Sequence, residues 1–176
     1  EFEDAILTYA PSKAGSLFGS DTDWFDEITR DNPISQQRHM ALSGGTEKFS
    51  HRTSLTYSTD QGLLQDNSSQ RILFKTNLVQ KVLKDRLTLD FNLATNLRDY
   101  KPANYELFRQ AFIQNPTQPV YDDSDPLTGG YSYEQGLEYY NPVALLNERT
   151  REGSTNDIIQ NLRATFKILE NLSWDN

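Results

Sequence analysis

The stretch LTLDFNL, Leu87–Leu93, has an apolar side chain at every second position, with Thr88, Asp90 and Asn92 between them. Successive residues of a β-strand point to opposite faces of a sheet, so this alternation predicts a strand with one apolar and one polar face. The same period recurs in four other stretches. The five predicted strands span about 37–44, 49–58, 70–82, 86–96 and 157–169. The chain is therefore expected to form an all-β, antiparallel sheet with two chemically different faces.

The connections between these strands alternate in length. The short ones are 44–48, 83–85 and 170–171, and the long ones are 59–69 and 97–156. All the long connections therefore leave from the same edge of the sheet. A loop of about sixty residues is out of place in a compact soluble domain, but long loops opposite short turns are usual in outer-membrane barrels. The pattern predicts part of a transmembrane β-barrel.

Composition is compatible with this interpretation. The 176 residues carry a net charge of -8 and have a mean hydropathy of -0.71. No run approaches the roughly 18 apolar residues of a spanning helix, but a spanning strand needs only about 9–11 residues with one apolar face. The absence of cysteine excludes disulfides and thiolate metal sites, and no concentrated basic face suggests nucleic-acid binding. The chain starts at Glu1 without a signal segment, which predicts either processing or an internal piece of a longer protein.

The first 35 residues are expected to be largely irregular. A short helix is predicted over 23–29, because Asp21 or Thr22 could cap its first turn and acidic residues suit its positive end.

The segment 97–156 differs chemically from the strands. It holds five of the seven prolines and seven of the nine tyrosines, with nine acidic against five basic residues. A helix is predicted over 105–114, because apolar residues recur four positions apart there, and Asn115-Pro116 would end it.

The tyrosines are the main candidates for substrate contact, since flat aromatic faces pack on sugar rings and phenol groups hydrogen-bond hydroxyls or amides. The alternative is that they pack the loop or sit at the membrane interface. The predicted substrate-binding residues are Tyr121, Tyr131, Tyr133, Tyr139 and Tyr140.

Charged and amide side chains on the polar strand faces are expected to line a wet lumen or to contact a plug, and a solvated sheet surface is the alternative. The predicted lumen-facing residues are Arg52, Lys75, Asp90, Asn92 and Arg163.

No metal or catalytic centre is predicted. His39 and His51 fall in facing strands without further ligands on the same face, so they are interpreted as ordinary strand residues. Asp122, Asp123 and Asp125 could bind calcium, but their spacing departs from an EF-hand loop, and solvation of the loop is favoured. No nucleophile elbow or oxyanion motif accompanies a possible Ser–His–Asp set, so an enzyme is not expected.

Several segments resemble the SusC/RagA family of TonB-dependent outer-membrane transporters. TDWFDEI at 22–28 is similar to the family signature near the junction of plug and barrel, and ISQQRHMALSGGTEKFSHRTSLTYSTDQGLL follows from Ile34 to Leu64. NPTQPVYDD at 115–123 and NPVALL at 141–146 resemble two landmarks of the family's long early loop. The resemblance covers most of 21–174, and the first twenty residues match less clearly.

The resemblance implies a barrel of about 22 strands preceded by a plug. Residues 1–35 would be the plug-to-barrel junction and 36–176 the N-terminal part of the barrel, with 97–156 as an extracellular loop. The chain would break off near Trp174 in a sixth strand.

The resemblance also implies nutrient uptake at the bacterial outer membrane without cofactor or bond chemistry. A Bacteroidetes-type glycan importer of this kind works with a SusD-like surface lipoprotein and is energised through the TonB complex. Import of oligopeptides by the same class of transporter is one alternative. A soluble, secreted, glycan-binding β-sandwich is another, because its strands would alternate in the same way.

Overall fold

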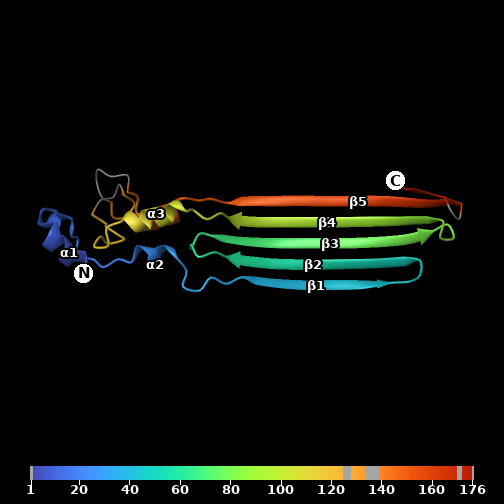
Figure 1. Cartoon of the computed structure of the whole chain (residues 1–176), viewed down its shortest axis with the longest axis horizontal. Coiled ribbons are helices and arrows are strands. Elements are labelled where there is room, and N and C mark those ends of the chain that lie inside the picture. Colours follow the sequence, from blue (N-terminus) through green and yellow to red (C-terminus); the bar gives the residue numbers. More distant parts are fainter. Residues whose placement is uncertain (1, 125–127, 134–138, 170–171, 176) are drawn as a thin grey trace. The chain divides into compact units, whose positions relative to one another are not determined.

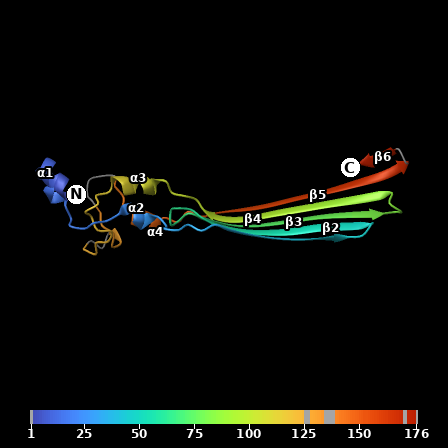
Figure 2. The ribbon, with the colours of Figure 1, turned by 60° about the horizontal axis from the view of Figure 1, so that its bottom comes forward.

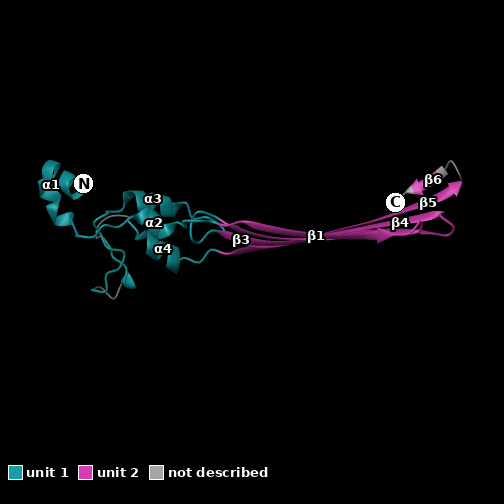
Figure 3. Ribbon diagram, turned by 90° about the horizontal axis from the view of Figure 1, so that it is seen from below, with its two compact units in different colours: residues 1–33, 62–67, 102–151 teal, residues 34–61, 68–101, 152–176 magenta. Residues whose placement is uncertain are grey.

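The computed structural model describes residues 2–124, 128–133, 139–169 and 172–175. These residues divide into two compact units (Figure 3). Unit 1 comprises residues 1–33, 62–67 and 102–151, and unit 2 comprises 34–61, 68–101 and 152–176.

Unit 2 is a single antiparallel sheet whose strands follow one another in sequence order (Figure 1). Its strands are β1 (Gln36–Gly45), β2 (Phe49–Gln61), β3 (Ser68–Val82), β4 (Leu87–Lys101), β5 (Gly153–Leu169) and β6 (Leu172–Asp175). The short β6 pairs with the end of β5, where Figure 2 shows it. The five predicted strands and the start of a sixth are confirmed, and so is the all-β, antiparallel fold class.

The register gives the sheet one apolar and one polar face. Leu89 in β4 is paired with Gln80 in β3 and with Ala164 in β5, and Phe91 is paired with Leu78 and Leu162. Directly paired residues share a face. Extended through all the pairings, the apolar face carries Met40, Leu42, Leu55, Tyr57, Ile72, Phe74, Leu78, Val82, Leu87, Leu89, Phe91, Leu93, Leu97, Ile158, Leu162 and Phe166.

The apolar face also carries polar side chains, among them Gln80 and Gln160, and two of its threonines bond to each other. Thr53 and Thr76 are cross-strand partners whose hydroxyls lie 2.9 Å apart. The His51 ring stacks on Phe49 at 5.6 Å between centroids. Arg38 lies on this face opposite Tyr57, towards the same end of the sheet as Leu97.

Three strands run at least three residues further than the alternation predicts. β2 continues to Gln61, β4 continues to Lys101, and β5 begins at Gly153. The added residues are mostly polar on both faces, so the two-residue period fades while the backbone ladder continues. The long connections are correspondingly shorter than predicted and span 62–67 and 102–152.

The described residues of unit 1 form four α-helices and one 3-10 helix. They are α1 (Phe2–Tyr9), η1 (Pro11–Ser16), α2 (Trp24–Ile28), α3 (Glu106–Ile113) and α4 (Pro142–Glu148). The predicted helices at 23–29 and 105–114 are present as α2 and α3. Asp23 caps α2 by accepting from the backbone N–H groups of Phe25 and Asp26, at 3.0 and 3.2 Å, so the predicted cap at Asp21 or Thr22 is wrong. In the described residues no helix is long and apolar enough to cross a membrane.

Helices α2, α3 and α4 share one small core. Its buried apolar residues are Trp24, Ile28, Leu64, Leu107, Ala111 and Val143. The Trp24 indole also donates to the Asn115 carbonyl at 3.0 Å, and the Thr22 hydroxyl donates to the Gln118 carbonyl at 2.7 Å. The TDWFDEI segment therefore folds together with the long segment between β4 and β5.

The connection between β2 and β3 is held beside the end of α2 by backbone hydrogen bonds and by the side chains of Arg30 and Gln65. The Arg30 guanidinium donates to the carbonyls of Gly62 at 2.8 Å and Asn67 at 3.0 Å, and also to those of Leu64 and Gln65. One cation thus donates to four carbonyls of a six-residue connection.

Candidate functional site

The chain folds back on itself between Val120 and Ser132, and this excursion brings two of the predicted tyrosines together. Tyr121 and Tyr131 form an antiparallel bridge, and their ring centroids lie 5.4 Å apart. Gly129 and Gly130 adopt φ values of +66° and +84°, which side-chain-bearing residues seldom adopt, and they let the chain return at this point. Tilted rings at this separation attract each other through their quadrupoles.

Asn141 anchors helix α4 beside this excursion. Its side-chain oxygen accepts from the backbone N–H groups of Val143 and Ala144, at 3.0 and 3.2 Å, and its amide donates to the carbonyls of Val120 and Ser132. Asn141 is 5% exposed, so this link between the helix and the hairpin is shielded from water. Residue Asn141 followed by proline is a strong helix-start signal, which the sequence reading missed.

Between the excursion and α4 lies a pocket of about 790 Å³. Tyr131, Tyr133 and Tyr140 line it together with Glu148 and Arg149 at the end of α4. Tyr133 and Tyr140 are 53% and 56% exposed, so their rings are accessible to a ligand. The Tyr131 hydroxyl accepts from the Asn147 amide at 3.1 Å, which orients the ring. A pocket with aromatic walls and a few charged groups is the usual form of a small-ligand site.

The structure therefore brings together three of the five predicted substrate-binding tyrosines. Tyr121 is coupled to the pocket through its contact with Tyr131, whereas the half-buried Tyr139 does not line it. Glu148 and Arg149 were not predicted, because only the helix α4 places them beside the tyrosines.

A chain of hydrogen bonds holds the Tyr140 backbone. Its N–H donates to the side-chain oxygen of Gln110 at 2.9 Å, and the Gln110 amide donates to Glu106 at 2.8 Å. Gln110 is fully buried. Hydrogen bonds from Arg109 and Gln110 keep the pKa of Glu106 below its usual value.

The predicted lumen residues all lie on the polar face of the sheet. Arg52, Lys75 and Asn92 line a hollow of about 470 Å³ on unit 2, and Asp90 is the cross-strand partner of Arg163. The Asn77 amide donates to Asp90 at 3.0 Å and to Asn92 at 2.6 Å, so Asn77 joins this group. The register identifies Asn77 and also Asn161, which the hollow includes, but the register could not be derived from the sequence.

The two histidines lie on opposite faces of the sheet. His39 is paired with Thr56, whose hydroxyl lies 2.8 Å from the His39 Nδ1, whereas His51 is paired with Gly44 on the apolar face. They therefore cannot share a metal ion. Asp125 of the possible calcium site lies outside the described residues, and the part of the chain that is described contains no group of three or more metal-ligating side chains.

Comparison with known proteins gives two relatives. The chain is 26% identical to the TonB-dependent receptor SusC of Bacteroides thetaiotaomicron over 189 residues, which cover 94% of this chain and 19% of the relative. It is 27% identical to the TonB-dependent receptor P26 of Formosa agariphila over 137 residues, which cover 78% of this chain and 13% of the relative. No known family model matches. The chain thus spans less than a fifth of the length of these curated relatives.

These matches confirm the resemblance to SusC-type TonB-dependent transporters. Such receptors are outer-membrane proteins and transporters rather than enzymes. This agrees with the outer-membrane location and the transport role predicted from the sequence.

Proposed function

We propose that this chain forms the plug-to-barrel junction and the first strands of an outer-membrane importer that takes up oligosaccharides with a SusD-like surface lipoprotein. Residues 1–35 act as the junction and 36–176 as the start of the barrel. The TonB complex energises the importer through a plug outside this chain. The similarity to SusC supports this assignment, and so does a sheet with one predominantly apolar face.

The tyrosine-lined pocket is the single observation that carries the substrate class. Two exposed rings, Tyr133 and Tyr140, stand at its wall, and such rings pack against the apolar faces of sugars. The segment that carries them connects β4 to β5 on the long-loop side, which faces the exterior in outer-membrane barrels. This position supports the proposal that the pocket receives an incoming ligand or a lid protein.

Import of oligopeptides is a second candidate because of two charged residues. Glu148 and Arg149 line the same pocket and could pair with the ammonium and carboxylate ends of a short peptide. Competition between unlabelled peptides and labelled oligosaccharide separates the two candidates. Nothing described here favours the β-sandwich, since all six described strands belong to one sheet.

The test uses the full-length transporter in cells that lack it. Tyr133→Ala and Tyr140→Ala should each reduce oligosaccharide uptake about three- to tenfold, the effect of losing one aromatic contact of about 0.5–1.5 kcal/mol. Tyr105→Ala is the matched control, because Tyr105 belongs to the same segment, is 77% exposed and does not line the pocket.

Deletion of residues 122–140 extends the test to the lipoprotein. Uptake and association with the SusD-like lipoprotein are measured separately, together with barrel assembly. Uptake and association at wild-type levels in an assembled barrel would show that this segment contacts neither the substrate nor the lipoprotein. The proposal would then be abandoned.

A further inference from the structure

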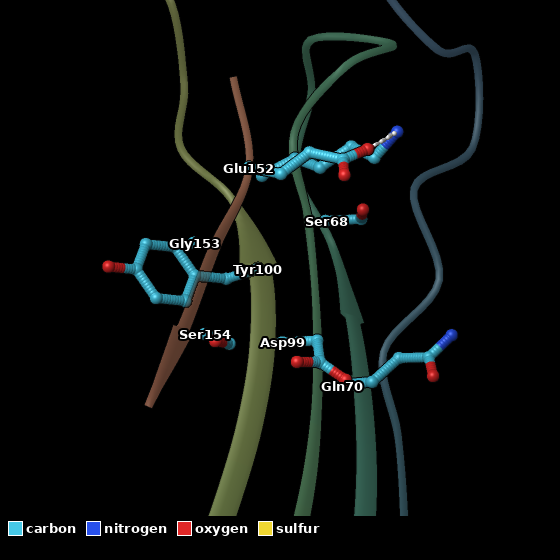
Figure 4. A pocket seen from close by; sticks show the side chains of 8 residues that line it. Ser68, Gln70, Asp99, Tyr100, Glu152, Gly153 and Ser154 are labelled. Carbon is cyan, nitrogen blue, oxygen red and sulfur yellow. Dashed lines mark ion pairs between the residues drawn. The ribbon is translucent and has the colours of Figure 1, made fainter. Parts of the chain in front are cut away.

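A polar pocket lies at one end of the sheet, on the same face as the apolar side chains. It has a volume of about 410 Å³ (Figure 4). The register puts Gln70, Asp99 and Ser154 in one row on this face, and Ser68 and Lys101 in the next. Lys101 forms an ion pair with Glu152 at 2.9 Å, which the dashed line in Figure 4 marks.

The position of this pocket along the membrane normal follows from the length of the apolar face. On β4 the apolar side chains run from Leu87 to Leu97, ten positions apart. This distance is about 33 Å along a strand. At the tilt of about 40° found in transmembrane barrels it projects to about 25 Å, which is the height of the apolar band. Asp99 and Lys101 therefore lie just beyond the band, at the level of the lipid headgroups.

The chemistry of the pocket suits a sugar. Asp99 and Glu152 accept hydrogen bonds, Lys101 donates them, and Gln70 and the serines do both, so together they match neighbouring hydroxyls on a ring. Two carboxylates against one ammonium disfavour an anionic headgroup. The opposite face at this end differs in charge, since Arg71 and Arg98 are paired there.

We propose that this pocket binds the sugar headgroup of a glycolipid in the outer leaflet of the membrane. The acyl chains of the same lipid lie on the apolar face around Ile72 and Leu97, which form the adjacent row. The proposal rests on the proposed function for the orientation of the sheet, in which the apolar face meets lipid and the long loops face outward.

The test uses the full-length transporter in nanodiscs of phosphatidylethanolamine with a small, equal fraction of one of two probes. The probes are a galactosyl diacylglycerol and a phosphatidylglycerol with the same acyl chains. Native mass spectrometry then counts the probe molecules that stay on the released protein. Wild type should retain the galactolipid in preference to phosphatidylglycerol.

Asp99→Ala should reduce galactolipid retention about fivefold, as expected for a charge-assisted hydrogen bond in an exposed site. Asp60→Ala is the matched control and should have no effect, because Asp60 lies at the same end of the sheet on the opposite face. Heat-modifiable gel mobility checks that each barrel has assembled. Gln70→Ala replaces Asp99→Ala if that variant does not assemble.

Equal retention by wild type and Asp99→Ala, or equal retention of the two probes, would overturn the inference. Oligosaccharide uptake is measured on the same proteins to separate this inference from the proposed function. Normal uptake without selective retention of galactolipid rejects the headgroup pocket alone, whereas wild-type protein that does not import oligosaccharide rejects the proposed function.

Discussion

The ring of Tyr100 lies over Gly153, its cross-strand partner at the start of β5. A Cβ added at Gly153 would lie 2.6 Å from the Tyr100 Cζ, closer than real contacts allow. The Arg98 guanidinium lies 4.9 Å from the centroid of the same ring. An aromatic side chain that covers a glycine on the neighbouring strand is a known device for fixing register at a sheet edge.

Gly153→Ala should therefore destabilise the barrel by about 1–2 kcal/mol, the usual effect of overpacking, because the Tyr100 ring must move away. Urea-dependent folding of the full-length transporter into lipid vesicles measures this difference. Gly15→Ala is the control, since an added Cβ there meets nothing within 4 Å. Equal loss of stability in both variants would mean that the ring does not depend on the glycine.

The two faces of β4 should respond differently to a charge. Phe91→Arg is expected to cost about 2–4 kcal/mol of folding free energy, because the proposed function puts Phe91 near the middle of the surface that meets lipid, where an arginine must leave water. Asn92→Arg, one residue further and on the polar face, should cost much less. The same folding titration compares the two variants. A larger loss for Asn92→Arg would show that the polar face, and not the apolar one, meets lipid.

The 176-residue piece is not expected to fold alone as a monomer. β1 and β6 each pair on one side only, and unpaired backbone edges invite association in water and are not tolerated in lipid. Size-exclusion chromatography in buffer without detergent should show aggregates. A monodisperse monomer with a cooperative melt would contradict the barrel and favour a soluble sandwich.

Lowering the pH should weaken ligand binding in the tyrosine-lined pocket, because Glu106 becomes protonated. Its lowered pKa means that the ionised carboxylate is stabilised in the folded state by Arg109 and Gln110. That contribution is present above the unfolded pKa of a glutamate and is lost as pH falls through the lower, folded value. The hydrogen bond from Gln110, which holds Tyr140, to Glu106 is then weaker because it is no longer charge-assisted.

Oligosaccharide affinity of the full transporter, measured against pH, tests this chain of bonds. Wild type should lose affinity in the acid range, whereas Glu106→Gln should be flat there because it has no proton to gain. If Glu106→Gln lost affinity in the acid range as wild type does, the pH dependence would belong to another group.

The strands could be predicted from the sequence because Leu87–Leu93 alternates without interruption and the other four stretches alternate over most of their length. The ends of the strands could not be predicted, since residues such as Asp99 and Ser154 continue the backbone ladder without alternating in polarity. Tertiary pairing extends a strand where side-chain pattern no longer indicates one.

The helices and the site residues could likewise be predicted only where a local sequence pattern marks them. α3 was predicted from its periodicity, whereas α1, which has the same length, was not predicted, and α4 was missed although Asn141-Pro142 marks its start. The tyrosines were correctly chosen as a group, yet only the folded excursion separates Tyr131, Tyr133 and Tyr140 from Tyr139. No local pattern could have placed Glu148 and Arg149 beside them.

The bonds from Trp24 and Thr22 to Asn115 and Gln118 bear on attempts to engineer this class of transporter. Exchange of residues 102–151 between two homologues would appear to be a self-contained graft, since these residues are contiguous. Their core, however, is completed by a helix encoded some eighty residues earlier. A chimera that carries only the later segment would pair mismatched halves, so donor sequence is required at both places.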